Sequence, residues 1–260
     1  MDKQVAVQAA QEALSEKTVV TLLTPIKGQP RKLYGPEGKR SDYDALQKTF
    51  KHRQVVVNSI DHFHELIGHW AAAGDSFIIP GEIRPDAGPI VNRRKLPDPS
   101  KPYPPDVIEA PVTWACFDVD YLPLPINVRS SPEAAAQFVI EQIAQVIPGF
   151  DQLSLVVQAS NSCGQPGKEY TAKFHFWFLL ARPWMPAKLK DVIKQANRIY
   201  RERNPDLAAH FKRETGKDFK LLDDALEKWS IVVYLSRFAQ AAIFSMLSCT
   251  PSLNTTPSMT

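Results

Sequence analysis

Asp118 and Asp120 end an apolar run and are separated by a single residue, Val119. The run, residues 113–122, contains Trp114 and is typical of a buried strand. Because side chains alternate faces along a strand, residues two apart project to the same side, and the two carboxylates are expected to point together. Such a pair is costly to bury unless a cation compensates its charge. Carboxylate oxygens suit Mg²⁺ and Mn²⁺, so the pair predicts a divalent metal site.

Two later segments carry side chains that suit the same chemistry. The β-prone run 173–180 places Lys173 and His175 on one face. Asp223 and Asp224 follow a pair of leucines and offer a third acidic position. Nucleotidyl transfer needs divalent ions held by carboxylates, which activate a 3′-hydroxyl and neutralise the leaving pyrophosphate, and a donor side chain that orients the triphosphate. The three segments together therefore predict a phosphoryl-transfer site.

An Asp-x-Asp sequence is a weak signal alone, because it also occurs in ordinary turns. Its position after a hydrophobic strand, and the two later segments, favour the metal site. His62, His64 and His69 do not indicate a zinc site, because their spacing lacks the i, i+4 pair that such sites use on a helix. We interpret them as surface or hydrogen-bonded histidines. The three cysteines lack Cys-x-x-Cys spacing and indicate neither a disulfide framework nor structural zinc.

The segment after the acid pair has the pattern of a helix followed by a strand. Ser131 is a capping residue, Pro132 suits the first helical position, and Pro148 with Gly149 ends the helical pattern. A strand is predicted over residues 153–160. The order strand, helix, strand indicates a crossover unit.

The remaining segments divide the chain into three predicted parts. Residues 1–90 are expected to form an α/β portion packed on the core, residues 91–240 the catalytic core, and residues 241–260 a disordered or altered tail. A proline-rich connector, residues 96–111, leads into the strand of the acid pair. Outside the crossover unit, helices are predicted over residues 5–16, 41–48, 186–203 and from Ser59 onward. Strands are predicted over residues 54–58 and 230–235, a strand or extended segment over residues 19–24, and a strand with a turn over residues 75–84.

The composition of the 260-residue chain, 44% hydrophobic and 23% charged, is typical of a soluble globular protein with a sizeable core. No apolar run is long enough to cross a bilayer, and the N-terminus lacks the pattern of a signal peptide. We therefore expect a cytoplasmic protein that does not bind membranes. The net charge of +3 is compatible with an anionic polymer as partner and too small to establish one.

Basic residues are concentrated in a few segments. Arg93, Arg94 and Lys95 precede the connector, and the predicted helix over residues 186–203 carries six lysines and arginines. Such groups contact nucleic-acid phosphates in some proteins and form a solvated face in others, and the sequence leaves both interpretations open.

In their order along the chain, these motifs resemble the archaeo-eukaryotic primase superfamily, specifically the primases and primase-polymerases of phages, plasmids and integrated elements. That family has an apolar strand ending in Asp-x-Asp, then a strand with a small or polar residue, any residue and His, then an apolar residue followed by Asp. The matching segments here are residues 117–120, 173–175 and 222–223. The similarity covers about residues 90–236 and includes Trp114 and the run 160–164.

The resemblance implies a fold and an activity. The fold would be α+β, with a mixed or antiparallel sheet related to an RNA-recognition module and flanked by helices. The activity would be that of a DNA primase or primase-polymerase, a nucleotidyltransferase that uses ribonucleoside or deoxyribonucleoside triphosphates on single-stranded DNA and serves a replicative helicase in DNA replication.

It also implies roles for individual residues. Asp118, Asp120 and Asp223 would be catalytic and would hold Mg²⁺ or Mn²⁺, with Asp224 as the alternative third ligand. Lys173 stands where the family often has a small hydroxyl residue. The residues expected at the incoming nucleotide are His175, Lys173, Ser160 and Ser162, and those expected at nucleic acid are Arg93, Arg94 and Lys95.

Three other functions fit part of the sequence. A glycosyltransferase uses Asp-x-Asp to hold the metal of a sugar nucleotide, but this leaves His175 and Asp223 unexplained. A non-catalytic replication initiator would use only the basic residues. A nicking endonuclease commonly pairs two histidines, whereas residues 174–176 contain one.

Overall fold

A computed structural model describes residues 18–27, 33–34, 40–41, 49–92, 105–160, 163, 170–223 and 243–246. Five residues of the predicted sites lie outside this range: Arg93, Arg94, Lys95, Ser162 and Asp224. The helix predicted over residues 5–16, most of the one over 41–48 and the strand over 230–235 also lie outside it.

The larger sheet contains the strands of the predicted site in the order β12-β10-β11-β9, with every neighbouring pair antiparallel. Its members are β9 (Val112–Val119), β10 (Leu155–Ala159), β11 (Phe174–Trp184) and β12 (Ile243–Met246). Since β9 and β10 are both antiparallel to β11, they run parallel to each other with β11 between them. The helix α3 (Pro132–Ala144) connects them, which confirms the predicted crossover. β12 lies within the predicted tail.

The helix α3 begins as the sequence predicts. The Ser131 hydroxyl accepts a hydrogen bond from the Ala134 backbone N–H at 3.2 Å, and Pro132 occupies the first turn, where no backbone donor is needed. The cap fixes the point at which the chain turns back from the end of β9 toward β10.

A second antiparallel sheet comes from the N-terminal portion, in the order β5-β1-β4-β7. Its strands are β1 (Thr18–Pro25), β4 (Phe50–Val57), β5 (Phe77–Ile79) and β7 (Ile90–Val91). Two short antiparallel pairs are β2 (Leu33–Tyr34) with β3 (Arg40–Ser41), and β6 (Glu82–Ile83) with β8 (Val107–Ile108). The helix α2 (Ile60–Ala73) starts at the Ser59 cap and ends at Gly74, whose left-handed backbone suits glycine.

Both faces of the larger sheet are buried in its central part. On one face, Phe63 of α2 packs edge-on against Trp114 and Trp177, with ring centroids 6.4 and 5.8 Å apart. On the other face, Phe150 packs against Phe117 at 5.6 Å. A strand with two buried faces needs apolar residues at nearly every position, which is why β9 reads as a continuous apolar run up to its acids.

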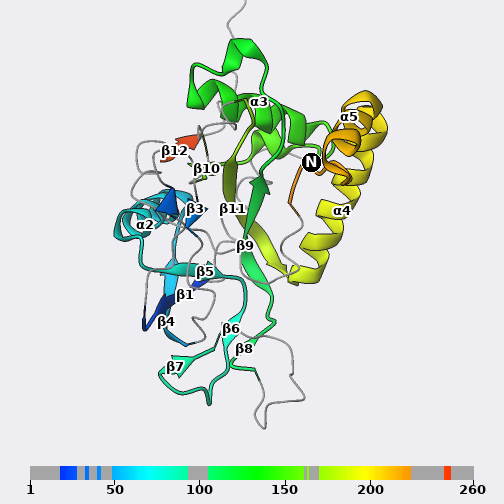
Figure 1. Ribbon diagram of the computed structural model, residues 1–260. Helices are drawn as coiled ribbons and strands as arrows, with labels where there is room; N and C mark the ends of the chain where they lie inside the picture. Colours follow the sequence, from blue (N-terminus) through cyan, green and yellow to red (C-terminus); the bar gives the residue numbers. More distant parts are fainter. Residues whose placement is uncertain are drawn as a thin grey trace, which may run out of the picture.

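The architecture is therefore α+β, with an antiparallel main sheet flanked by helices. In the view of Figure 1, α2 lies on one side of β9 and β11, and α4 (Pro186–Arg203) with α5 (Pro205–Thr215) lies on the other. No helix within the described residues is both long and apolar enough to cross a membrane.

Candidate metal centre

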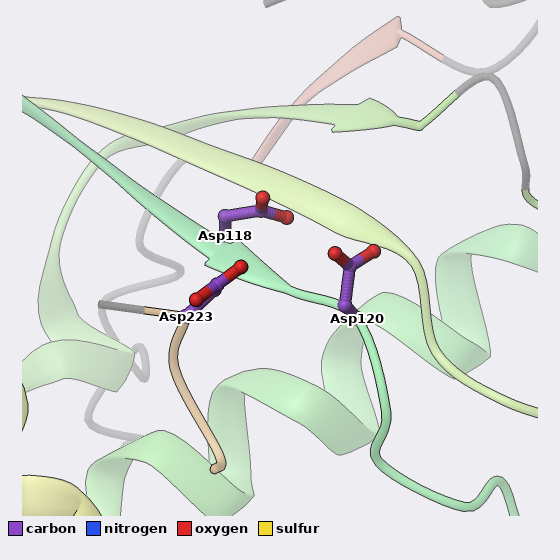
Figure 2. Close-up of side chains that lie close together, drawn as sticks. All are labelled: Asp118, Asp120 and Asp223. Carbon is purple, nitrogen blue, oxygen red and sulfur yellow. The ribbon is translucent and has the colours of Figure 1, made fainter. Parts of the chain in front are cut away.

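The structure brings together the three acids that the sequence singles out. Asp118, Asp120 and Asp223 each offer a carboxylate oxygen, and these oxygens all lie within 4.8 Å of one another. Figure 2 shows two of the side chains at the end of β9 and the third on the coil that passes beside it. All three are half-buried. Within the described part of the chain, no other group of three acidic, histidine or cysteine side chains is spaced to hold a metal ion.

The pairing of β9 with β11 sets the direction of Asp118. Asp118 lies directly opposite His175, and Val119 lies opposite Phe174. Beyond the strand end, an isolated bridge pairs Pro123 with Thr171. Between these two pairs, the chain after β9 advances by four residues, from Val119 to Pro123, while the chain before β11 spans only three, from Thr171 to Phe174. The chain after β9 therefore contains one extra residue. Such a bulge-like irregularity often changes the direction of side chains near functional sites. Asp120 lies within it, so strand alternation alone does not determine its direction.

Lys173 is paired with Asp120. Its ammonium donates hydrogen bonds to the backbone oxygen of Asp120 at 2.8 Å and to its carboxylate Oδ1 at 3.0 Å. The Lys173 side chain is only 6% exposed, and its ammonium also lies 5.1 Å from the centroid of the Tyr121 ring. Lys173 therefore compensates the charge of Asp120 and orients its carboxylate. This contact differs from the contact with the incoming nucleotide that the sequence predicts.

His175 is a buried, neutral donor beside Asp118. Its Nε2 lies 3.5 Å from Asp118 Oδ1. Burial lowers the pKa of His175 to about 4, which outweighs the opposing effect of the Asp120 carboxylate. At neutral pH the imidazole is therefore uncharged and carries one N–H. Its Nδ1 has no hydrogen-bond partner among the described residues, and neither has Nε2 of Gln158, which lies opposite His175 on β10.

Asp223 reaches the centre on a coil rather than on a strand. Its backbone N–H donates to the Asp118 backbone oxygen at 2.7 Å, which attaches the coil to the edge of β9. The preceding residue, Leu222, is held by Asn197 of α4 through two hydrogen bonds, from Asn197 Nδ2 to Leu222 O at 2.8 Å and from Leu222 N to Asn197 Oδ1 at 2.9 Å. Lys220 Nζ lies 4.0 Å from Asp223 Oδ1 at a more exposed position.

Asn197 supports this coil but belongs to none of the sequence motifs of the predicted site. It is 4% exposed and lies on the face of α4 that is otherwise apolar. A polar residue inside the apolar stripe of an amphipathic helix was the available signal, because a buried amide must find hydrogen-bond partners.

Ser160 lies close to the centre through its backbone. Its N–H donates to the Lys173 backbone oxygen at 2.8 Å, and its own oxygen accepts from the Cys163 N–H at 2.9 Å. The nucleotide contact expected of Ser160 stays a prediction. His62 lies on α2, where its Nδ1 accepts from the Asn58 N–H at 3.3 Å.

The donor set suits a hard divalent cation. Two unit charges 4 Å apart repel by on the order of 4 kcal/mol at an effective dielectric constant of about 20. Three carboxylates within this range therefore need positive charge nearby, and His175 supplies none at neutral pH. Lys173 and Lys220 balance part of the negative charge of the three carboxylates. Oxygen ligands of this kind fit Mg²⁺ or Mn²⁺ better than they fit softer metals.

No protein-family model, curated protein or solved structure matches the chain. The resemblance to primases consequently depends on the order and spacing of the motifs alone.

Proposed function

We propose that this chain is a metal-dependent nucleotidyltransferase of the primase-polymerase type, which joins nucleoside triphosphates into primers on a single-stranded DNA template. The observation that carries the proposal is the convergence of acids from two distant segments, Asp118 and Asp120 with Asp223, beside the neutral donor His175. A glycosyltransferase that holds one ion with a single Asp-x-Asp motif needs neither Asp223 nor His175.

The roles of the residues follow from their environments. Asp118, Asp120 and Asp223 would hold Mg²⁺ or Mn²⁺, and the bound ion would supply the positive charge that activates a 3′-hydroxyl and stabilises a leaving pyrophosphate. His175 would donate its single N–H to a phosphate oxygen of the incoming nucleotide. A neutral donor keeps the affinity for the triphosphate moderate, since it adds orientation without a further full charge.

Lys173 has a different role in this proposal from the one that the sequence suggests. Its ammonium is bound to Asp120 and is almost fully buried. It would hold Asp120 in its orientation and reduce the repulsion among the acids before a cation binds.

The test is incorporation of labelled nucleotides on unprimed single-stranded DNA with Mg²⁺ or Mn²⁺. The wild type is compared with Asp118→Asn and with Asp191→Asn, which removes an exposed acid from α4. We expect metal-dependent oligomers from the wild type and from Asp191→Asn only. Turnover of a sugar nucleotide without template would overturn the proposal in favour of a glycosyltransferase.

A non-catalytic DNA-binding initiator is the second candidate, and the surface of α4 favours it. The helix carries exposed cations that include Lys188, Lys194 and Arg198. Salt-sensitive DNA binding that is equal in the wild type and in Asp118→Asn, with no metal-dependent product from either, would support the initiator.

A further inference from the structure

Asn197 forms a two-point hydrogen-bonded contact with a backbone that belongs to no helix or strand. Both bonds to Leu222 are buried, and they pair Nδ2 and Oδ1 of Asn197 with the carbonyl and N–H groups of Leu222. A buried amide without partners costs free energy, so the side chain and the coil each depend on the other. The apolar neighbours of Asn197 on the buried face of α4 are Leu189, Ile193, Ala196 and Tyr200.

Other contacts extend the attachment of this coil to α4. Arg201, one turn beyond Asn197, donates from Nη1 to the Phe219 backbone oxygen at 3.1 Å. The Tyr200 ring stacks on Phe219 with centroids 5.8 Å apart. Leu221 and Leu222 are fully buried. The coil is thus fixed to α4 over residues 219–222 before it reaches the acids.

The far end of the same coil is fixed to β9. The Asp223 N–H donates to the Asp118 backbone oxygen at 2.7 Å, directly after the residue that Asn197 holds. The peptide group that joins Leu222 to Asp223 is therefore bonded on both sides: its carbonyl to Asn197 of α4 and its N–H to Asp118 of β9. Figure 2 shows the resulting position of its carboxylate beside that of Asp118.

We propose that Asn197 is a positioning residue that holds Asp223 in the geometry needed to share one divalent cation with Asp118 and Asp120. This inference depends on the proposed metal-dependent function. Asn197 acts on the position of Asp223 through the backbone of Leu222. Groups that hydrogen-bond to metal ligands and orient them typically change metal affinity by about 10- to 100-fold when they are removed.

The experiment measures the Kd for Mn²⁺ by electron paramagnetic resonance in the wild type, Asn197→Leu and a matched control, Asn204→Leu. Asn204 also lies at α4 and donates to a backbone oxygen at 3.0 Å, but this oxygen belongs to Tyr200 of α4 itself and not to the coil of Asp223. We expect Asn197→Leu to weaken Mn²⁺ binding by about 10- to 100-fold and Asn204→Leu to leave it within about twofold of the wild type.

Activity provides a second readout, provided that the variant is folded at every Mn²⁺ concentration used, because bound Mn²⁺ would also rescue a variant that is only destabilised. Primer synthesis by Asn197→Leu should recover as the Mn²⁺ concentration is raised, at a temperature where circular dichroism shows the variant to be folded. An unchanged Kd in folded Asn197→Leu would overturn the role of Asn197 and leave the proposed function intact. Absence of Mn²⁺ binding in the wild type would instead overturn the metal centre itself.

Arg201→Met keeps the inference testable if Asn197→Leu does not fold. It removes the bond to the Phe219 oxygen, at the half-buried end of the same attachment. We expect a loss of Mn²⁺ affinity in the same direction and smaller than that of Asn197→Leu. An affinity equal to that of the wild type would contradict the proposal.

Discussion

Asp118 lies in β9, which is hydrogen-bonded to β11, and Asp120 comes directly after that strand, whereas Asp223 lies on a coil outside both sheets. The first two acids are placed by contacts within the main sheet: Asp118 faces His175 across the strands, and Lys173 holds Asp120. The third acid is placed by contacts of its coil with α4 and by one backbone hydrogen bond to Asp118 of β9.

The positions of the acids therefore depend on two different kinds of contact. Asp118 is fixed by a ladder of backbone bonds, which a single side-chain change does not remove, and Asp120, just beyond that ladder, is held by Lys173. The coil of Asp223 is fixed by a few contacts, of which the buried pair from Asn197 to Leu222 is the most specific. We therefore expect changes at the acids to act on chemistry, and changes on α4 to act through the position of Asp223.

The largest effect is expected from Asp118→Asn and Asp120→Asn. Each keeps the shape of the side chain and removes a charged ligand, so primer synthesis should fall below detection. The melting temperature should stay equal to that of the wild type or rise in Asp118→Asn, and should fall in Asp120→Asn, which leaves the buried Lys173 ammonium without its charged partner. A higher melting temperature would reflect relief of repulsion among the acids. Full synthesis by either variant, measured with labelled nucleotides, would exclude that residue as a ligand.

The coil region is tested by comparing Asp223→Asn with Asp224→Asn. A site filled at 100 times its Kd stabilises the fold by about 2.7 kcal/mol, so added Mn²⁺ should raise the melting temperature of the wild type. Asp223→Asn should lose this rise and Asp224→Asn should keep it. The opposite result would identify Asp224 as the third ligand.

A moderate effect is expected from Lys173→Met. The change removes the ammonium beside Asp120 and should lower the free energy of unfolding without metal by about 2 kcal/mol. Mn²⁺ should then bind more tightly, because it no longer competes with a fixed cation. Lys220→Met is the matched control, with a longer and more exposed contact to Asp223 that should contribute less than about 1 kcal/mol. Weaker Mn²⁺ binding by Lys173→Met would show that Lys173 aids metal binding by orienting Asp120 more than it hinders binding by its positive charge.

The smallest effect concerns the pH dependence of stability. The pKa of His175 is about 4 in the fold, below its ordinary value of 6.5, because burial disfavours the charged imidazole. The unfolded chain therefore binds the proton more readily, and stability should fall as pH decreases from 6.5 toward 4. Urea denaturation across this range should give a flatter profile for His175→Gln. His210→Gln, which changes an exposed residue of α5, should retain the wild-type slope; equal slopes in all three proteins would contradict the burial effect.

Much of the sheet and the acid pair could be predicted because the information is local. The apolar run before Asp118 predicted β9, the Ser131–Pro132 cap predicted the start of α3, and strand alternation indicated that Asp118 and Asp120 lie together. These features depend on neighbouring residues, whose periodicity and capping chemistry are visible in the sequence.

The contacts that complete the centre could not be predicted because they join distant residues. Lys173 and Asp120 are 53 positions apart, and Asn197 and Leu222 are 25 apart. Whether Lys173 faces a phosphate or an acid depends on the irregular pairing beyond Val119, which no motif records. The role of Asn197 depends on where the coil crosses α4, and this is a property of tertiary packing.

The most direct test of a single centre assembled from two regions is a Mn²⁺-binding cycle with the wild type, Asp118→Asn, Asp223→Asn and the double variant. If both acids share one ion, each single change should weaken binding strongly and the double change should cost less than the sum of the two. We predict this non-additive result. Losses that add independently, or a wild type that binds no Mn²⁺, would contradict the account.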